Sequence, residues 1–459
     1  MNIKKILFIN PVNKQRGLAG ARFSCFPPLS LGILAKLTPP DKEIYMIDEN
    51  FDNFDEKIKK IGRVDLVGIT SYTSNVSRAY EIAKFFKEQN IPVIMGGIHV
   101  SFLPYEALQF CDSVVIGEAE GVWEKVLEDI ENNRLQRMYK QDRKFEDIKI
   151  ETPRRDIYNS KYFWGMIQTS RGCPMNCEFC SVTIYNGHKY RKRPIEEIIN
   201  ELKTIKQKYI CFFDDNIVGR TKEQKEHALL LFKRMVEEKL NKIWFAQCSI
   251  NVGEEEEILK WMYKSGCRIL LIGLESIDEE SLKEMHKQEN VRILNKINDL
   301  IKNIHKNGIA IIGSFIIGSS NDNLNTINKT VNFIIKNDID SVLITHLTPF
   351  PGTRLYTKMQ QENRIIANNY PDDWIKYNFS NVVYKHEKLS KEELIYIVDS
   401  IKNKIVAPFW MLIKRFIKTL FNTISFRAAL IALLWNIGLR NIYLRGLKQR
   451  KKVAVDNQK

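Results

Sequence analysis

The stretch SRGCPMNCEFC, residues 170–180, holds the strongest signal in this chain of 459 residues. Its cysteines Cys173, Cys177 and Cys180 have CxxxCxxC spacing and directly follow a predicted strand. A structural zinc site normally closes with four ligands in two separated pairs, whereas the next cysteine, Cys211, lies 31 residues further on. Three thiolates suit a [4Fe–4S] cluster with one open iron. A zinc site and buried free thiols are the weaker alternatives.

Outward from this loop, short apolar segments alternate with amphipathic helical patterns. This alternation, at about 30 residues per unit, predicts a parallel (β/α) barrel. The predicted strands are 165–170, 208–213, 243–249, 268–274, 309–317 and 341–347. Six units are fewer than the eight of a complete barrel, so we expect a partial barrel whose active site lies at the C-terminal strand ends.

A separate alternation precedes it and predicts a doubly wound (Rossmann-like) parallel sheet. Its strands are 6–10, 43–48, 66–71, 92–97 and 113–118. Ligands of such sheets bind beyond the carboxyl ends of the strands. The residues expected there are Asn10, Ser71, Thr73, Gly96, Gly97, His99, Gly117 and Glu118. No GxGxxG motif follows the first strand, which disfavours a dinucleotide ligand.

The whole chain is therefore predicted to be α/β. Its predicted parts are a first domain 1–130, a linker 131–160, a partial barrel 161–355 and a helical, basic C-terminal region 356–459. The net charge is +15, but residues 401–459 alone contribute +12, with 13 Lys and Arg against one acid. Because nucleic-acid-binding proteins usually spread basic charge along a groove, we expect no nucleic-acid partner. Eight cysteines and no signal peptide indicate a cytoplasmic protein.

At the cysteine motif the sequence resembles the radical S-adenosylmethionine (SAM) enzymes, and with its first domain it resembles their cobalamin-dependent branch. The resemblance covers nearly all of residues 1–355. It includes, in order, PPLSLG (27–32), GGIH (96–99), GEAE (117–120), FDDN (213–216), GLES (273–276) and PFPGT (349–353). Ala119 departs from the family, which often has glycine there. No DxHxxG motif occurs, so the resemblance implies cobalamin bound without a lower histidine ligand.

The resemblance also implies roles for individual residues. Cys173, Cys177 and Cys180 would hold the [4Fe–4S] cluster, with SAM on its open iron. The residues implied to contact SAM are Phe179, Asp214, Asp215, Gln247, Ser249, Glu275, Ser276, Gly313 and Ile316. Among these, Phe179 would lie along the adenine and the Asp pair near the amino group. Cobalamin would contact the strand-end residues of the first domain. No residue is assigned a catalytic acid–base role.

The activity implied is that of a cobalamin-dependent radical SAM C-methyltransferase, acting on an unactivated carbon of a small molecule. An external electron donor, such as flavodoxin or ferredoxin, would reduce the cluster. One alternative is a non-methylating radical enzyme of the same architecture, catalysing an oxidative cyclisation or a rearrangement. A third hypothesis is a zinc- or cluster-bearing regulatory protein, which the near-neutral body of the chain disfavours.

Residues 405–452 predict two helices with a basic end. Phe409, Trp410, Phe416 and Phe421 give the first an apolar face typical of a peripheral anchor at the inner face of a membrane. Such an anchor would favour a lipid or isoprenoid-type substrate. A helical cap that closes the open barrel is an equal alternative. A spanning helix is not expected, because the 12 mostly apolar residues between Arg427 and Arg440 fall short of the required length of about 20.

Overall fold

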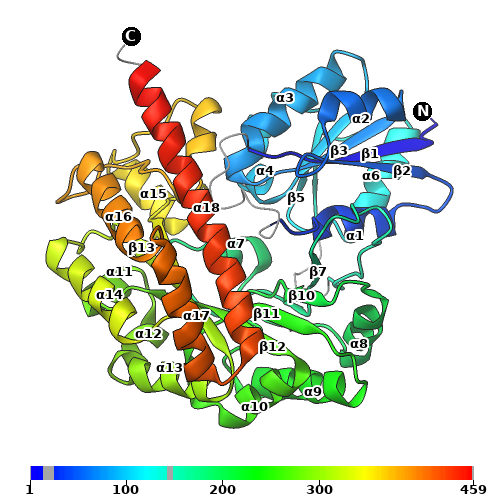
Figure 1. Cartoon of the computed structure of the whole chain (residues 1–459). Coiled ribbons are helices and arrows are strands. Elements are labelled where there is room, and N and C mark those ends of the chain that lie inside the picture. The colour runs from blue at the N-terminus through cyan, green and yellow to red at the C-terminus, as the bar shows by residue number, and fades with distance from the viewer. Residues whose placement is uncertain (1, 14–24, 142–147, 457–459) are drawn as a thin grey trace.

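The computed structural model describes residues 2–13, 25–141 and 148–456, and side chains up to residue 448. Part of the predicted linker, 142–147, and the side chains of the basic end, 449–459, lie outside the described residues. Two parallel six-stranded sheets, one in each half of the chain, form the framework (Figure 1). The predicted α/β class and the two parallel sheets are thus confirmed.

The first sheet has strand order β2-β1-β3-β4-β5-β6, with every pair parallel. Its strands are β1 (Lys5–Asn10), β2 (Glu43–Asp48), β3 (Leu66–Thr70), β4 (Val93–Gly96), β5 (Ser113–Ile116) and β6 (Met138–Lys140). The helices between them are α1 (Leu29–Leu37), α2 (Phe54–Ile61), α3 (Val76–Lys87), α4 (Ile98–Phe102), α5 (Pro104–Ala107) and α6 (Trp123–Glu131).

Strand β6 differs from the sequence prediction, because it lies within the segment interpreted as a linker. It has only three residues and is flanked by polar ones, which hides it from a search for apolar runs. Its central residue, Tyr139, is buried and donates a hydrogen bond to Asp129 at 3.0 Å. Further on, Arg155 donates to the carbonyl of Met166 at 2.7 Å. The segment between the sheets is therefore docked at both of its ends.

The second sheet has strand order β14-β13-β12-β11-β10-β7, with every pair parallel. Its strands are β7 (Trp164–Ile167), β10 (Tyr209–Phe212), β11 (Ile243–Cys248), β12 (Cys267–Glu275), β13 (Ala310–Ile317) and β14 (Ser341–His346). The helices that follow them are α8 (Ile195–Thr204), α9 (Lys222–Glu237), α10 (Glu256–Ser265), α11 (Glu279–Glu284), α12 (Gln288–Ile293), α13 (Ile297–Lys306) and α14 (Leu324–Lys336).

A small antiparallel hairpin follows the first barrel strand and encloses the cysteine motif. It consists of β8 (Ser170–Arg171) and β9 (Arg191–Lys192), with the short helix α7 (Val182–Asn186) between them. The cysteine loop therefore lies at the C-terminal end of β7, as the barrel prediction requires.

The C-terminal region is helical and reaches both domains. It contains α15 (Arg354–Gln361), α16 (Lys391–Ile405), α17 (Phe409–Thr423) and α18 (Phe426–Asp456). The segment between α15 and α16 contributes Trp374 and Tyr377 to the hydrophobic core of the first domain. Helix α18 instead runs along the barrel (Figure 1), where Ala428, Ile431 and Ala432 pack with inward-facing strand residues. None of the described helices has both the length and the apolar character needed to cross a membrane.

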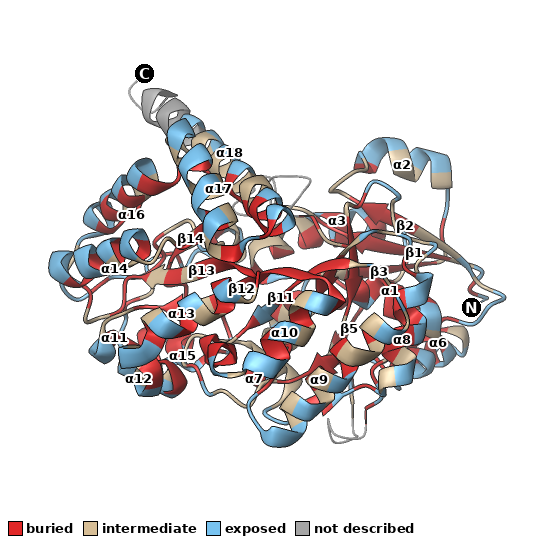
Figure 2. Cartoon of the chain, turned by 60° about the horizontal axis from the view of Figure 1, so that its bottom comes forward, coloured by how far each residue is buried: buried red, intermediate tan, exposed pale blue. Residues whose placement is uncertain are grey.

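Buried residues are concentrated in the strands, and exposed residues lie mostly on the outer sides of the helices (Figure 2). Strand alternation divides the barrel core in two. On β12, for example, Leu270 and Ile272 pack towards the covering helices, whereas Ile269 packs on the inner face with α18. Residues at the C-terminal ends of the inner face are those that remain available to a ligand.

Candidate functional site

The cysteine loop is held in place by backbone contacts at both of its ends. Gly172 has φ +88°, and a Cβ at this position would lie 2.2 Å from the carbonyl oxygen of Lys189. Only glycine fits this close approach. Further along, the N–H of Glu178 donates to the carbonyl of Met285 at 3.1 Å. Arg354 donates to the carbonyl of Asn176 at 2.5 Å.

The three thiols of the loop are free and lie close enough to influence one another electrostatically. Burial raises the pKa of Cys173 to about 11 and that of Cys180 to about 12. Without a positive partner these thiols would stay protonated, so an iron cluster would supply the charge that stabilises the thiolates. In the described part of the chain, no three His, Cys, Asp or Glu side chains are arranged to hold a single metal ion. A [4Fe–4S] cluster does not require that arrangement, because each thiolate binds a different iron.

A half-buried lysine that sequence reasoning missed lies beside this loop. Lys287 Nζ is 3.1 Å from Glu275 Oε1. Burial alone would lower the pKa of Lys287, but the negative charge of Glu275 outweighs it and raises this pKa. Glu275 has φ +62°, which is uncommon for a residue with a side chain and marks a local constraint at the end of β12. No motif singled out Lys287, since it lies 12 residues beyond Glu275 on a separate element.

The two aspartates after β10 have different surroundings. Asp214 accepts hydrogen bonds from the side chains of Thr169 and Ser170, at 2.7 and 2.6 Å, and from the N–H of Thr169. Burial raises the pKa of Asp214 to about 6. Asp215 instead accepts from the N–H of Gly172 at 3.2 Å, next to the first cysteine. Asp214 thus fixes the turn before the cysteine loop, and Asp215 is the carboxylate that faces the loop itself.

The other residues predicted to contact SAM lie near the C-terminal ends of the strands, with one exception. Phe179 and Ile316 belong to the same small hydrophobic cluster. Gln247 is exposed although it lies within β11. Gly313, by contrast, faces the covering helices, because a Cβ there would meet Ile339 and Phe315 at 3.0 Å.

Strand alternation therefore corrects the prediction for Gly313: its neighbour Ser314, and not Gly313, shares the inner face with Ile316.

The two predicted serines have local partners. Ser249 Oγ accepts from Asn216 Nδ2 at 2.9 Å, and Ser276 Oγ accepts from the N–H of Asp278 at 3.1 Å.

In the first domain, the predicted cobalamin contacts do gather at the C-terminal edge of the sheet. Ser71 Oγ is buried and has no hydrogen-bond partner among the described residues. A Cβ on Gly117, where φ is +79°, would meet nothing within 4 Å. An unsatisfied hydroxyl and an open stretch of backbone at the same edge of the sheet fit a large polar ligand. Asn10 is less available, because it donates to Asp48 at 3.0 Å.

Two other predicted contacts, His99 and Gly97, interact with neighbouring parts of the first domain. His99 is fully buried, with Nδ1 3.2 Å from Thr73 Oγ1 and Nε2 3.2 Å from Glu106 Oε1. Both ring nitrogens of His99 are thus occupied, and burial lowers its pKa. Gly97 has φ +98° and packs against β3, since a Cβ would lie 2.5 Å from the carbonyl oxygen of Ser71. Gly96 makes only ordinary contacts with the next strand.

Glu118 joins the two domains instead of facing a ligand. Its carboxylate lies 2.5 Å from Arg171 Nη1 and also pairs with Arg191, so it contacts both strands of the cysteine hairpin. Glu120 pairs with the same Arg171 at 2.7 Å. Nearby, Tyr185 of α7 donates to the carbonyl of Gly117 at 3.1 Å. The end of β5 and the cysteine hairpin therefore form one buried contact.

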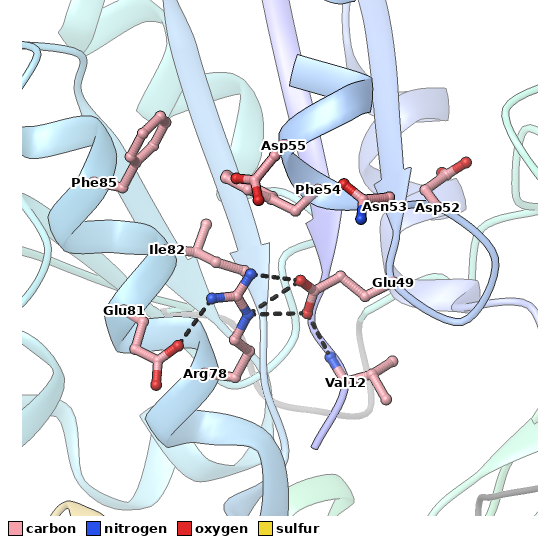
Figure 3. A pocket seen from close by; sticks show the side chains of 10 residues that line it. All are labelled: Val12, Glu49, Asp52, Asn53, Phe54, Asp55, Arg78, Glu81, Ile82 and Phe85. Atoms are coloured by element: carbon pink, nitrogen blue, oxygen red, sulfur yellow. Dashed lines mark hydrogen bonds and ion pairs between the residues drawn. The ribbon is translucent and has the colours of Figure 1, made fainter. Parts of the chain in front are cut away.

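A surface cavity of about 500 Å³ lies elsewhere, between α2 and α3 of the first domain (Figure 3). An ion pair between Arg78 and Glu49 lines the cavity, with Nη2 and Oε1 2.7 Å apart. Glu49 also accepts from the N–H of Val12 at 3.0 Å, and Glu81 takes the other side of Arg78 at 2.8 Å. Because Arg78 and Glu49 are already paired within the protein, we assign no ligand to this cavity.

Two family models match the chain. The B12 binding domain covers residues 16–127, and the Radical SAM superfamily covers residues 167–334. A curated relative, the bacteriochlorophyllide d C-8(2)-methyltransferase of Chlorobaculum tepidum, is 32% identical over 86% of this chain and 88% of that protein. The chain belongs to the radical SAM superfamily. As a radical SAM enzyme with a B12 binding domain, it uses a [4Fe–4S] cluster, SAM and cobalamin.

Two further proteins are similar to this radical SAM enzyme over more than nine tenths of its chain. An uncharacterised methyltransferase of Pyrococcus horikoshii is 30% identical over 92% of this chain and 95% of that protein. The solved structure of the cobalamin-dependent SAM radical enzyme OxsB, with aqua-cobalamin and SAM bound, is 14% identical. It has a TM-score of 0.69 and covers 96% of this chain and 72% of that one. At this identity the likeness to OxsB supports the fold alone.

Proposed function

We propose that this radical SAM enzyme is a C-methyltransferase acting on a small organic molecule. The observation that carries the proposal is the contact between the two sites: Tyr185 and Arg171 of the cysteine hairpin bind Gly117 and Glu118 at the cobalamin edge of the first domain. A methyl group can pass from cobalamin to a carbon activated beside the cluster only if both cofactors face one substrate. The similarity to curated methyltransferases over most of the chain supports the same reaction.

When bound, the cluster and SAM supply a carbon-centred radical that removes hydrogen, and cobalamin supplies the methyl group. The chain's own residues position these groups. Cys173, Cys177 and Cys180 would hold the cluster, and Asp215 and the Lys287–Glu275 pair would present charge to the polar groups of SAM. Phe179 and Ile316 would give its adenine an apolar wall. An external electron donor of the flavodoxin or ferredoxin class would reduce the cluster.

The substrate is proposed to be amphiphilic, with a polycyclic or lipid-like body. The C. tepidum relative acts, by its name, on a bacteriochlorophyllide. Helix α18 covers most of the inner face of the barrel, so a ligand can reach only its C-terminal end, where apolar Ile316 lies with the polar groups of Gln247 and Ser314. Such a surface binds the body of a ligand through hydrophobic contact and orients it through a small number of hydrogen bonds.

The test is an anaerobic assay of the reconstituted holoenzyme with SAM, reductant and candidate amphiphiles. Methyl transfer requires S-adenosylhomocysteine, 5′-deoxyadenosine and a product heavier by one methylene unit. If a substrate yields 5′-deoxyadenosine and a changed product without S-adenosylhomocysteine, the proposal is wrong and a cyclisation or rearrangement replaces it. Cys177→Ala should abolish SAM cleavage, whereas Cys111→Ala, a buried cysteine of the first domain, should not.

A further inference from the structure

Helix α17 and the turn after it expose an unusual concentration of apolar side chains. Nine of the twenty large apolar side chains exposed in the described part of the chain fall within residues 409–437. Six of them form what we call the α17 face: Phe409, Trp410, Ile413, Ile417, Phe421 and Ile424. Proteins in water rarely leave a contiguous apolar surface of this kind uncovered, and those that do generally use it to bind.

The α17 face is not the side of the helix that packs on the protein. Phe409, Ile413, Ile417 and Phe421 follow one another at intervals of four residues and so share one side. The opposite side is buried and holds Leu412, Thr419 and Thr423. Phe421 is 75% exposed, and Ile424 in the following turn is 89% exposed. The fold therefore needs only one side of α17 and leaves the more apolar side in water.

Charge around the α17 face points to the occupant. Residues 400–455 contain no Asp or Glu. Lys404 and Arg427 are exposed near its two ends, and Lys414, exposed within α17, lies over the ring of Trp410 at 5.8 Å. A fourth cation, Lys418, pairs with Asp338 at 3.1 Å. An apolar stripe with aromatic residues and flanking cations is typical of helices that lie in the headgroup region of an anionic bilayer.

The neighbouring helix holds the α17 face at a fixed position. Ala428, Ile431 and Ala432 of α18 pack on the inner side of the barrel sheet, and Arg415 of α17 donates to Asn436 of α18 at 3.0 Å. Helix α18 therefore covers the inner side of the barrel sheet, as one of the two alternatives drawn from the sequence expects, while α17 remains outside it. Figure 1 shows the two helices side by side along the barrel.

We propose that the α17 face is a membrane-docking surface that lies in the plane of a bilayer containing anionic lipids. Docking would bring the barrel to the surface where an amphiphilic substrate is dissolved. The proposal stands on the surface itself and does not depend on the reaction that the enzyme catalyses.

The experiment is flotation of the full-length holoenzyme with two kinds of vesicle, one of phosphatidylcholine alone and one of equal parts phosphatidylcholine and phosphatidylglycerol. We expect binding to the anionic vesicles and little to the neutral ones. The double variant Trp410→Gln/Phe421→Gln should lower the partition coefficient at least tenfold, and Lys414→Gln/Arg427→Gln should lower it by a similar factor because each cation near the surface contributes to attraction.

Matched controls are Tyr105→Gln/Leu324→Gln and Lys222→Gln/Lys302→Gln, which change exposed residues outside the α17 face and should leave binding unchanged. Equal binding by wild type and the Trp410→Gln/Phe421→Gln variant would overturn the proposal. It would equally be overturned if sedimentation showed a dimer that this variant dissociates, since the α17 face would then cover a second copy. Loss of binding with unchanged SAM cleavage would support it.

Discussion

Half-buried Lys287 and buried Glu275 form an ion pair, with Nζ and Oε1 3.1 Å apart, next to the cysteine loop. A buried pair is costly to break from one side, because the remaining charge is left without a partner. Lys287→Met keeps the length and removes the charge. We expect it to lower the free energy of unfolding by about 3–5 kcal/mol, measured by denaturant titration of the cluster-free protein.

Removing both charges separates this cost from any role towards cofactors. The double variant Lys287→Met/Glu275→Leu should regain most of the stability lost in Lys287→Met, because no buried charge is left unpaired. SAM affinity, measured by calorimetry on the reconstituted protein, should remain weakened in the double variant. Full SAM affinity in a stable double variant would show that the pair serves the fold alone.

The ion pairs of Glu118 predict a variant that loosens the contact between the domains. Glu118→Gln leaves Arg171 and Arg191 buried with a weaker acceptor. We expect a loss of about 3–5 kcal/mol and faster proteolysis between the sheets, within residues 131–160. The matched control is Glu81→Gln, which breaks the exposed pair with Arg78 and should cost no more than about 1 kcal/mol.

His305 predicts a pH dependence of stability. Its Nε2 lies 2.8 Å from Asp340 Oδ2, and both residues are buried. Burial alone would lower the pKa of His305, but the attraction of Asp340 outweighs it and raises this pKa above the ordinary 6.5. Because the pKa is raised in the folded state, protonated His305 stabilises the folded protein fully below pH 6.5. This contribution to the free energy of unfolding is lost as the pH rises through the raised pKa.

The measurement is the difference in unfolding free energy between the wild type and His305→Gln, across that range of pH. Because glutamine keeps a hydrogen-bond donor but does not titrate, the advantage of the wild type should be larger at low pH and shrink as the pH rises. A difference independent of pH would contradict the assignment of a charged pair.

Trp374 predicts that a segment after the barrel helps to stabilise the first domain. Its ring stacks on Tyr370 at 3.8 Å between centroids, and Nε1 donates to Glu106 at 3.0 Å. Trp374→Ala should cost about 3–5 kcal/mol. Trp410→Ala, an exposed tryptophan on α17, should change stability by no more than about 0.5 kcal/mol. Equal effects of the two substitutions on thermal unfolding would contradict this role.

The amino-acid sequence was sufficient to predict the architecture and the cofactor loop. Periodic apolar segments give strands and helices locally, so β7 and β10–β14 were predicted close to their observed bounds. The role of the three cysteines could be predicted because they all lie within eight residues of one loop, which keeps their side chains close together in any fold. Strand β6 was not predicted, because a strand of three residues among polar neighbours shows no recognisable apolar pattern.

The three-dimensional structure was needed to show which of the predicted polar contacts are already paired within the protein. Glu118 has the residue type of a ligand contact, yet Arg171 and Arg191, more than 50 residues further along the chain, already pair with it. His99 is likewise occupied, by Thr73 from another element and by Glu106. Lys287, at the start of α12, lies beside the cysteine loop because it pairs with Glu275 at the end of β12. Pairing across separate elements depends on side-chain packing in three dimensions, which the spacing of residues along a chain does not encode.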